Sequence, residues 1–220
     1  MLYKILCCVL LLGLLSSCKL KTVSLYNDSG KVEEQYQVMR KQKEVKHGVY
    51  KFYHPNGQIA IECMYVEGKA DGKEKVYYDN GQLESIAVLE KGVYHGSFFY
   101  YFEDGTLKQE GTYIKNQYQG KLKTYYANGI LKEVVTMLDN LEQGPFVEYY
   151  ENGNLKAKGA YMSKNEEKAA LEMGLLEEYD KYGMLVAKKI CRAGHCCEIW
   201  NLEEGDVKPN SKLCEAIIND

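Results

Sequence analysis

Glycine recurs in this chain at a fixed interval, and that interval constrains the fold more than any other feature. Six units each begin with a leading glycine: Gly48, Gly72, Gly96, Gly120, Gly144 and Gly174. The first five are 24 residues apart. A constant period of this length is typical of repeat architectures, in which each unit packs on its neighbours. We therefore expect a molecule that grows along one axis.

A second glycine follows nine residues after each leading glycine: Gly57, Gly81, Gly105, Gly129, Gly153 and Gly183. In the first five units this glycine is preceded by Asn or Asp, as in Asn56-Gly57. Such pairs favour two-residue hairpin turns, because both residues tolerate positive φ. Each unit is thus predicted to be a β-hairpin, with its glycines assigned to turns.

Other positions of the unit are also constant. Tyrosine stands five residues after every leading glycine: Tyr53, Tyr77, Tyr101, Tyr125, Tyr149 and Tyr179. Leu or Ile stands at the eleventh place, as in Ile59, and a small or apolar residue follows four places later, as in Cys63 and Gly111. Charged residues alternate with these, so the period is two and one face is buried. We expect the small residues to leave room for a tyrosine ring.

The outgoing strand of each unit is less regular. Tyr50 and Phe98, two places after the leading glycine, are out of phase with Tyr53 and Tyr101. Strict alternation places residues three apart on opposite faces of a sheet. A bulge near the middle of the strand, or a sheet covered on both sides, would reconcile the two positions.

Consecutive hairpins are joined by a second turn at the twentieth place of the unit, as at Gly68 and Asn116. The predicted fold is therefore all-β: an elongated antiparallel β-meander of tandem 24-residue β-hairpin repeats. About 14 strands spaced by ~4.8 Å would form a rod of roughly 65 Å. Residues 48–191 hold the six repeats, residues 22–47 a degenerate N-terminal hairpin, and residues 163–168 an inserted loop.

The start of the chain has the composition of a secretory leader, so residues 1–17 are predicted to be a signal peptide. Its apolar run is too short to span a membrane as a helix. Leu15-Ser16-Ser17-Cys18 resembles the lipobox of bacterial lipoproteins, which implies lipidation of Cys18 and a tether over residues 18–21. A plain secretory leader and an uncleaved anchor are the alternatives. All three predict a location in the cell envelope, facing the periplasm or the cell surface.

The end of the chain, residues 192–220, is predicted to be a cysteine-rich cap. Four cysteines gather near it: Cys191, Cys196, Cys197 and Cys214. Two disulfides are the favoured state in an oxidising envelope, with free thiols or a metal site as alternatives. Four cysteines allow three pairings, and a bridge between the adjacent Cys196 and Cys197 would be strained. We expect Cys214 to fold the tail back over the last sheet edge.

Several classes of function are disfavoured. Twenty-eight basic and 31 acidic residues give a net charge of -3, so no basic field for nucleic acid is present. We expect His47 and His95 to be exposed turn residues and not a metal-binding pair. Lysine recurs on the outgoing strand, at Lys51, Lys75 and Lys123, and such ladder lysines could bind anionic lipid. The acidic residues between them favour an ordinary solvent-exposed face instead. No nucleophile elbow or phosphate loop occurs. We predict neither an enzyme nor a bound cofactor or metal.

The pattern G-x-x-x-x-Y-x-x-N-G-x-L resembles the MORN-variant repeat of bacteria over about residues 22–191. Asp104, Tyr182 and the insertion depart from it. Similar proteins are often described as antitoxin or immunity partners of a toxin, so the resemblance implies a binding scaffold with a protein partner and no catalytic residue. Exposed members of the row of repeated tyrosines are the expected contacts with the partner. A structural or surface-adhesion lipoprotein and an anionic-lipid-binding protein are the alternatives.

Overall fold

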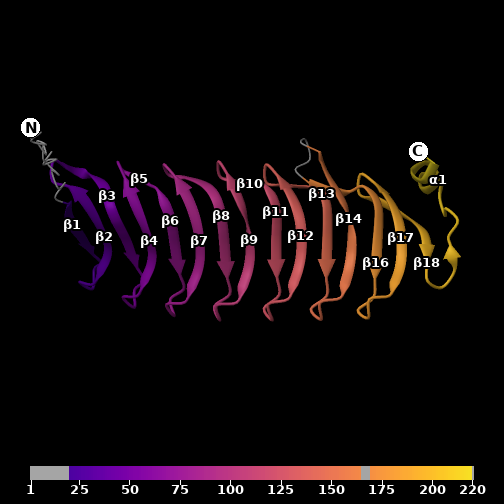
Figure 1. The fold of residues 1–220 in the computed structure, drawn as a ribbon, viewed down its shortest axis with the longest axis horizontal. Helices are drawn as coiled ribbons and strands as arrows, with labels where there is room; N and C mark the ends of the chain where they lie inside the picture. The colour runs from indigo at the N-terminus through magenta and orange to yellow at the C-terminus, as the bar shows by residue number, and fades with distance from the viewer. Residues whose placement is uncertain (1–19, 165–168, 220) are drawn as a thin grey trace, which may run out of the picture.

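A computed structural model describes residues 20–164 and 169–219, and these form one long antiparallel sheet whose strands follow one another in chain order (Figure 1). The predicted fold class is confirmed. The signal peptide, Cys18 and residues 165–168 of the predicted loop lie outside the described residues. The sheet has 19 strands, more than expected. Three outgoing strands are each divided by a bulge into two strands, and the two ends of the chain contribute further strands.

The strand and helix bounds are β1 Leu20–Tyr26, β2 Val32–Met39, β3 Gln42–Tyr53, β4 Ile59–Val66, β5 Lys69–Ala70, β6 Gly72–Tyr77, β7 Leu83–Glu90, β8 Val93–Tyr101, β9 Leu107–Ile114, β10 Gln117–Tyr118, β11 Gly120–Tyr125, β12 Leu131–Leu138, β13 Leu141–Tyr149, β14 Leu155–Lys164, β15 Ala169–Glu172, β16 Gly174–Tyr179, β17 Leu185–Arg192, β18 His195–Asn201, β19 Gly205–Asp206 and α1 Lys212–Asn219. No helix in the described part of the chain is long and apolar enough to cross a membrane.

The Asn-Gly turns are three-residue loops, so the predicted two-residue turn is wrong at this place. In the first unit, the amide of Gly57 donates to the carbonyl of His54 and the amide of His54 donates to the carbonyl of Gln58, both at 2.8 Å. Gly57 has a φ of 92°, whereas Asn56 is not among the residues with positive φ. A type I turn followed by a left-handed glycine has this geometry. Asn56 instead accepts the amide of Gln58 on its side chain.

The second turn of each unit is the one that places two consecutive residues at positive φ. The pairs are Glu67-Gly68, Lys91-Gly92, Lys115-Asn116, Asp139-Asn140 and Ala193-Gly194. Two-residue loops of this kind match the twist of the strands that they join. The second turn lies where it was predicted. It has the two-residue form that we expected at the Asn-Gly pairs.

The leading glycines lie in strands, at bulges, and the prediction that they form turns is wrong. In β8, Gly96 has a φ of 121°. The pairing of β8 with β7 shifts beside it, because Tyr94 pairs with Leu89 and Phe98 pairs with Ala87. The extra residues of such a bulge require a positive φ, which residues with a side chain rarely adopt, so glycine recurs there.

A second bulge lies in the returning strand and assigns side chains to the two faces. Phe52 pairs with Ile61 and Tyr53 with Ile59, so Ala60 has no direct partner. Ile59 therefore lies with Tyr53 on one face, whereas Cys63 lies with Tyr50 on the other. The predicted shared face for the eleventh and fifteenth places is wrong. Tyr50 and Tyr53 do lie on opposite faces, and no bulge in the middle of the outgoing strand is needed.

We call the side with Tyr50, Phe98 and Phe146 the aromatic face. The side with the repeated tyrosines of the fifth place, which we call the tyrosine ladder, is the opposite face. Most buried side chains lie on the aromatic face, including Phe98 at 0% exposure and Val135 at 2%. A Cβ added to Gly111 would lie 2.9 Å from the ring of Phe98. Gly111 and Gly159 therefore make room for a phenylalanine ring where we expected a tyrosine, whereas Cys63 in the first unit pairs with Tyr50.

The C-terminal cap is held by two disulfides, Cys191–Cys196 and Cys197–Cys214. Cys191 lies on the aromatic face, and Cys197 pairs in register with Ile190 on the opposite face. The second disulfide therefore ties α1 to the opposite face, where Ile217 is buried. Together with β19, this tail lies against the last long strand.

Candidate functional site

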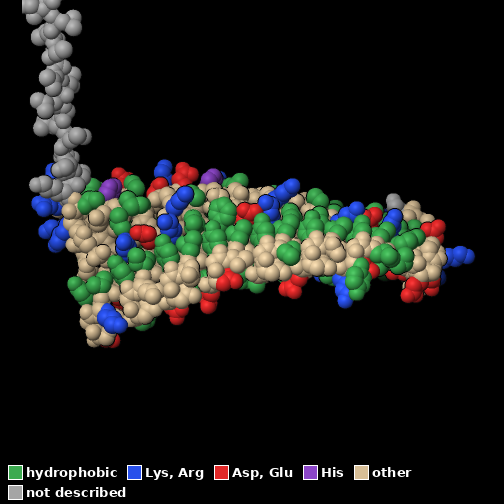
Figure 2. Space-filling view, turned by 60° about the horizontal axis from the view of Figure 1, so that its bottom comes forward, with side chains coloured by type: hydrophobic (Ala, Val, Ile, Leu, Met, Phe, Trp, Pro, Cys, Tyr) green, Lys and Arg blue, Asp and Glu red, His purple; other side chains and the backbone are tan. Residues whose placement is uncertain are grey.

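The middle of the aromatic face is a cluster of packed rings. The ring of Phe98 lies 5.4, 4.6 and 5.2 Å from those of Tyr100, Tyr113 and Tyr118. The Tyr113 hydroxyl donates to the Tyr118 hydroxyl at 3.0 Å. Hydrophobic side chains form a band along the rod, with charged side chains at its margins (Figure 2). The rings around Phe98 form an apolar surface with hydroxyl groups set into it.

Burial makes three tyrosine hydroxyls of this face harder to ionise. It is the main cause that raises the pKa of Tyr94, Tyr113 and Tyr161 well above the usual value. Tyr94 also donates to the carboxylate of Glu74 at 2.7 Å, which adds to its shift. The face therefore presents hydrogen-bond donors over the whole physiological pH range.

The N-terminal end of the aromatic face holds a lysine among three tyrosines. The Lys46 ammonium lies 4.8, 4.4 and 5.5 Å from the ring centroids of Tyr36, Tyr50 and Tyr65. It also donates to Glu34. Aromatic faces attract cations through their quadrupole, and the carboxylate adds a charged partner. We call these five residues the lysine cage.

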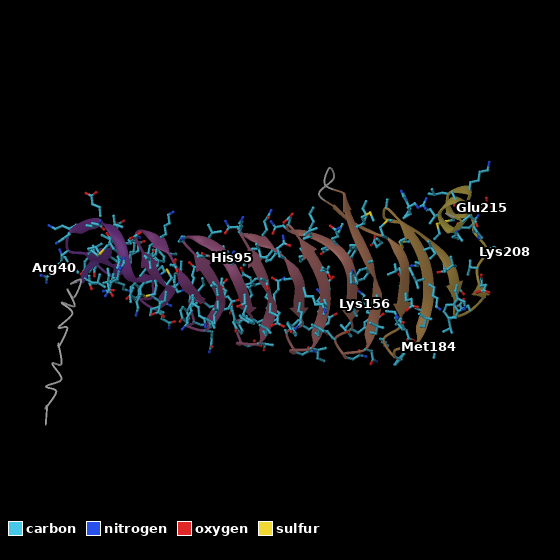
Figure 3. All side chains as sticks on the ribbon, turned by 45° about the horizontal axis from the view of Figure 1, so that its top comes forward. Arg40, His95, Lys156, Met184, Lys208 and Glu215 are labelled. Atoms are coloured by element: carbon cyan, nitrogen blue, oxygen red, sulfur yellow. A yellow bond between two sulfur atoms is a disulfide. The ribbon has the colours of Figure 1, made fainter. Side chains whose placement is uncertain are left out.

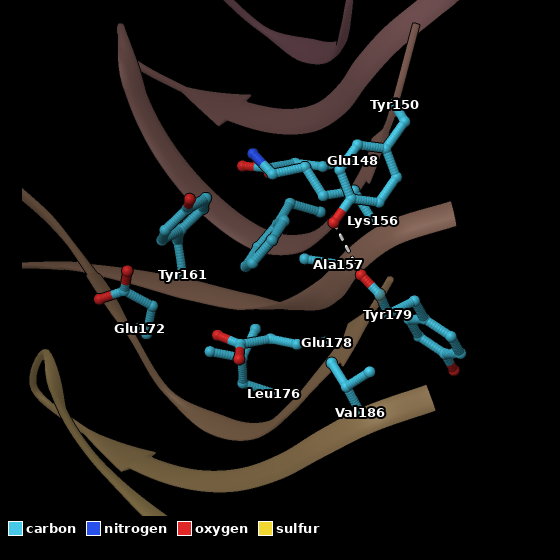
Figure 4. Close-up of a pocket in the computed structure, with 11 residues that line it drawn as sticks. Glu148, Tyr150, Lys156, Ala157, Tyr161, Glu172, Leu176, Glu178, Tyr179 and Val186 are labelled. Atoms are coloured by element: carbon cyan, nitrogen blue, oxygen red, sulfur yellow. Dashed lines mark hydrogen bonds and ion pairs between the residues drawn. The ribbon is translucent and has the colours of Figure 1, made fainter. Parts of the chain in front are cut away.

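The C-terminal end of the same face has a pocket of about 350 Å³ lined by carboxylates and rings (Figure 4). Phe146 and Tyr161 stack beside it with centroids 4.3 Å apart. Glu148 in β13 lines it and pairs with Lys156 at 2.8 Å, while Glu172 lines it from β15. The pocket has no nucleophile paired with a base, and its lining suits binding.

Burial and neighbouring carboxylates raise the pKa of the acids next to this pocket. For Glu133 the causes are burial first, then Glu142 and Glu148, with Lys132 and Lys156 opposing. For Glu142 they are burial and then Glu148. Negative charge is therefore crowded at this end of the face.

Side chains at the sixth and eighth places connect neighbouring units along one edge. The hydroxyls of Tyr78, Tyr126 and Tyr150 each donate to the carbonyl at the fifth place of the next unit, at 2.7, 2.8 and 2.9 Å. His54 Nε2 bonds the corresponding carbonyl at 2.8 Å. Asn128 reaches Glu151 in the same way. These hydrogen bonds between units were not predicted from the sequence, although aromatic or His side chains recur at the sixth place.

The predicted contact tyrosines lie elsewhere. All six ladder tyrosines at the fifth place are only half-exposed, and they lie on the opposite face. Tyr26 and Tyr182, at 63% and 78% exposure, are the tyrosines among the exposed large side chains. The clustered rings of the aromatic face surround Phe98 at the second place and come from the fourth, seventeenth and twenty-second places.

The remaining candidates have structural partners, or are simply exposed or buried. Two ladder lysines, Lys51 and Lys123, pair with Glu62 and Glu110. His47 Nδ1 accepts the amide of Glu67 at 3.4 Å, and exposed His95 projects near the edge of the second turns (Figure 3). Burial raises the pKa of the Cys63 thiol to about 11. Within residues 20–164 and 169–219, no group of three metal-binding side chains occurs.

The fold and its faces define an elongated repeat scaffold built on one sheet. The family model described as MORN repeat variant matches residues 46–67, 70–89, 94–115, 118–139 and 142–162. The chain therefore contains five MORN-variant repeats. Repeats of this family are non-catalytic modules that generally mediate interactions with proteins or membrane lipids. The hairpin of β16 and β17 has the same geometry but lies beyond the matched repeats.

Other comparisons add little. No protein with a curated description matches the chain. A porin-like protein from Bacteroides uniformis is similar over 81% of this chain and 92% of its own, with 8% identity and a TM-score of 0.21. A TcdB2-TccC3-TEV structure is similar over 81% of this chain and only 12% of its own, with 11% identity and a TM-score of 0.22. Such TM-scores carry no argument.

Proposed function

We propose that this chain is a non-enzymatic scaffold, anchored in the bacterial envelope through Cys18, that binds another protein along its aromatic face. The observation that carries the proposal is the cluster of packed rings and hydroxyls around Phe98. Aromatic residues are the commonest interface anchors, because they offer a large apolar area at a low entropic cost. The family's general role in protein and lipid interactions supports it.

Site-specific photocrosslinking in the native cell tests the binding face. A photoreactive phenylalanine replaces Tyr118 on the aromatic face or, as the matched control, Lys73 on the opposite face. We expect one protein adduct of constant mass from position 118 and none from position 73. Adducts that form equally from both positions, or only with lipid, would contradict the proposal.

Anchoring is tested separately by metabolic labelling with a clickable fatty acid. The wild-type chain should be labelled and should fractionate with membranes, whereas Cys18→Ser should be unlabelled. An unlabelled wild-type chain in the cytoplasm would refute the envelope location.

For the partner, we propose a toxin that the chain neutralises, on the strength of the family resemblance. Depleting the chain should arrest growth in cells that make the crosslinked partner, and deleting that partner should remove the arrest. Normal growth of depleted cells that still make the partner would rule out an immunity role. A structural or adhesion lipoprotein would then be the better description.

A further inference from the structure

The two ends of the sheet differ in how their outer edges are covered (Figure 1). At the C-terminal end the tail lies along β18: β19 pairs with its last two residues, and the amide of Val207 donates to the carbonyl of Ile199 at 3.0 Å. The Cys197–Cys214 disulfide holds α1 beside the same strand. An open edge presents unpaired N–H and C=O groups, which proteins generally cover. The chain covers this edge with its own tail.

The N-terminal edge is formed by β1, and within residues 20–164 and 169–219 no strand pairs with its outer side. β1 is seven residues long, and its pairing with β2 is regular from Leu20 to Leu25, with a shift at its last residue. It contains no proline and one charged residue, Lys21. The features by which exposed edges usually avoid pairing are therefore almost absent from β1.

β1 also carries large apolar side chains that are exposed: Leu20, Leu25 and Tyr26. Leu25 lies on the aromatic face, because it pairs with Glu34 of the lysine cage. Leu20 and Tyr26 lie on the opposite face, because side chains alternate along a strand. An edge with free backbone groups and apolar side chains on both faces is typical of a strand that pairs with another chain.

We infer that β1 pairs with β1 of a second copy, antiparallel and around a two-fold axis at Val23, so that two chains form one continuous sheet. Such an axis is perpendicular to the sheet, so residues directly opposite each other lie on the same face. Pairing centred on Val23 engages the whole of β1. It places Lys21 opposite Leu25 of the second copy on the aromatic face. On the opposite face it places Leu20 opposite Tyr26 of the second copy.

The strand is self-complementary in this register. Each exposed apolar side chain gains a partner on its own face, and the stem of Lys21 covers Leu25. The β-branched side chain of Val23 packs against its own copy. The two Lys21 side chains stay about 13 Å apart along the strands, so like charges do not meet. A pair of this length forms about six to eight backbone hydrogen bonds.

The covered C-terminal edge limits the assembly to two copies. Head-to-tail pairing needs the outer edge of β18, which the tail occupies. Like edges can therefore meet only at β1, and a two-fold contact of this kind leaves no β1 edge for a third copy. The inference goes beyond the proposed function and is independent of it, although the axis places both aromatic faces on the same side of the dimer.

Thiol crosslinking in the native cell tests the contact. In Val23→Cys, the thiols of two copies should be joined by a short bismaleimide, because directly opposed Cβ atoms lie about 5 Å apart. We expect an adduct with the mass of two chains. Asp206→Cys, exposed on the strand that covers the other edge, is the matched control and should form none. The wild-type chain gives the background from its own cysteines.

Charges placed at the axis test the two-fold register. Val23→Lys and Val23→Glu each set like charges directly opposite one another, so each variant alone should dimerise about fivefold or more weakly than the wild type. Sedimentation velocity of the full mature chain measures this. An equimolar mixture of the two variants should recover the dimer, because opposite charges then face each other. Val23→Thr should behave as the wild type does, and thermal melts show whether each variant is folded.

Three results would overturn the inference: a wild-type chain that sediments only as a monomer, a dimer that both charged variants retain, or a mixture of folded variants no more dimeric than its components. Crosslinking of position 23 to a different protein would show that the edge receives a foreign strand instead. A dimer that forms only after removal of the residues before Leu20 would show that the chain covers this edge itself. The photocrosslink from position 118 tests the protein-binding role separately.

Discussion

Gly111 and Gly159 are the residues at which a returning strand passes a phenylalanine ring. Neither has a positive φ, so backbone conformation does not require glycine. Space does, because an added Cβ would lie 2.9 Å from Phe98 at one position and from Phe146 at the other. Interiors this closely packed respond to a single methyl group.

At this scale we predict that Gly111→Ala destabilises the fold by about 1–3 kcal/mol through overpacking. Phe98→Leu should cost less in the Gly111→Ala background than in the wild type, because a smaller side chain relieves the clash. Urea unfolding of the two single variants and the double variant measures both effects. Additive free energies would show that the ring and the methyl group do not collide.

The two turns of each unit are the elements that sequence rules describe least well. Asn-Gly suggests a two-residue loop, yet the Asn side chains accept nearby backbone amides and, in several units, reach the next unit. Those extra bonds accompany a three-residue loop. The strict demand for positive φ falls on pairs such as Lys91-Gly92, whose first residue is not specialised for it.

Lys91→Asn should therefore stabilise the protein, by up to about 1 kcal/mol, because Asn tolerates the φ of 51° better than Lys. A rise in melting temperature would be the readout. Asn80→Gly, in the other turn of the same unit, is the contrasting variant and should lower it, since the bond from the Gln82 amide is lost. The reverse order would contradict the assignment of turn types.

Helix α1 is the element whose position depends on one covalent link. Its attachment is the Cys197–Cys214 disulfide, and Ile217 is its buried residue. We predict that C197S/C214S removes hydrogen-exchange protection from residues 212–219 while β7 to β9 keep theirs, since repeat units depend mainly on their neighbours. Loss of protection throughout the sheet would show that the cap stabilises the whole array.

At the scale of the whole molecule, the sheet has an uneven charge distribution along its length. Carboxylates crowd the C-terminal end of the aromatic face, where burial and mutual repulsion raise the pKa of Glu133 and Glu142. A carboxyl whose pKa is raised by folding binds its proton more tightly in the folded state. Its charge therefore destabilises the fold at neutral pH, and this cost disappears as pH falls through the raised pKa.

We predict that E133Q/E142Q raises the melting temperature at about pH 7, and that the gain vanishes as pH falls toward the ordinary carboxyl pKa of about 4.3. Melts over this range, with Glu90→Gln as the control, measure the difference. Glu148, Lys132 and Lys156 face Glu133 and stay in place in all three proteins. An equal gain at both ends of the range would contradict the raised pKa.

The sequence by itself determined the repeat, the hairpins, the antiparallel order of the strands and the position of both turns. It did so because the 24-residue period and the glycines report local backbone geometry, which each unit repeats. It also identified the four cysteines that form the two disulfides, although not their pairing.

Tertiary structure alone decided the faces. A single extra residue, such as Ala60, reverses the alternation that sequence patterns assume, and so the ladder tyrosines and the ring cluster lie on opposite sides. The same holds for the lysine cage and for the acids beside the Phe146–Tyr161 stack. Their members come from strands of different units, and only the register of those strands brings Lys46 or Glu142 beside the rings.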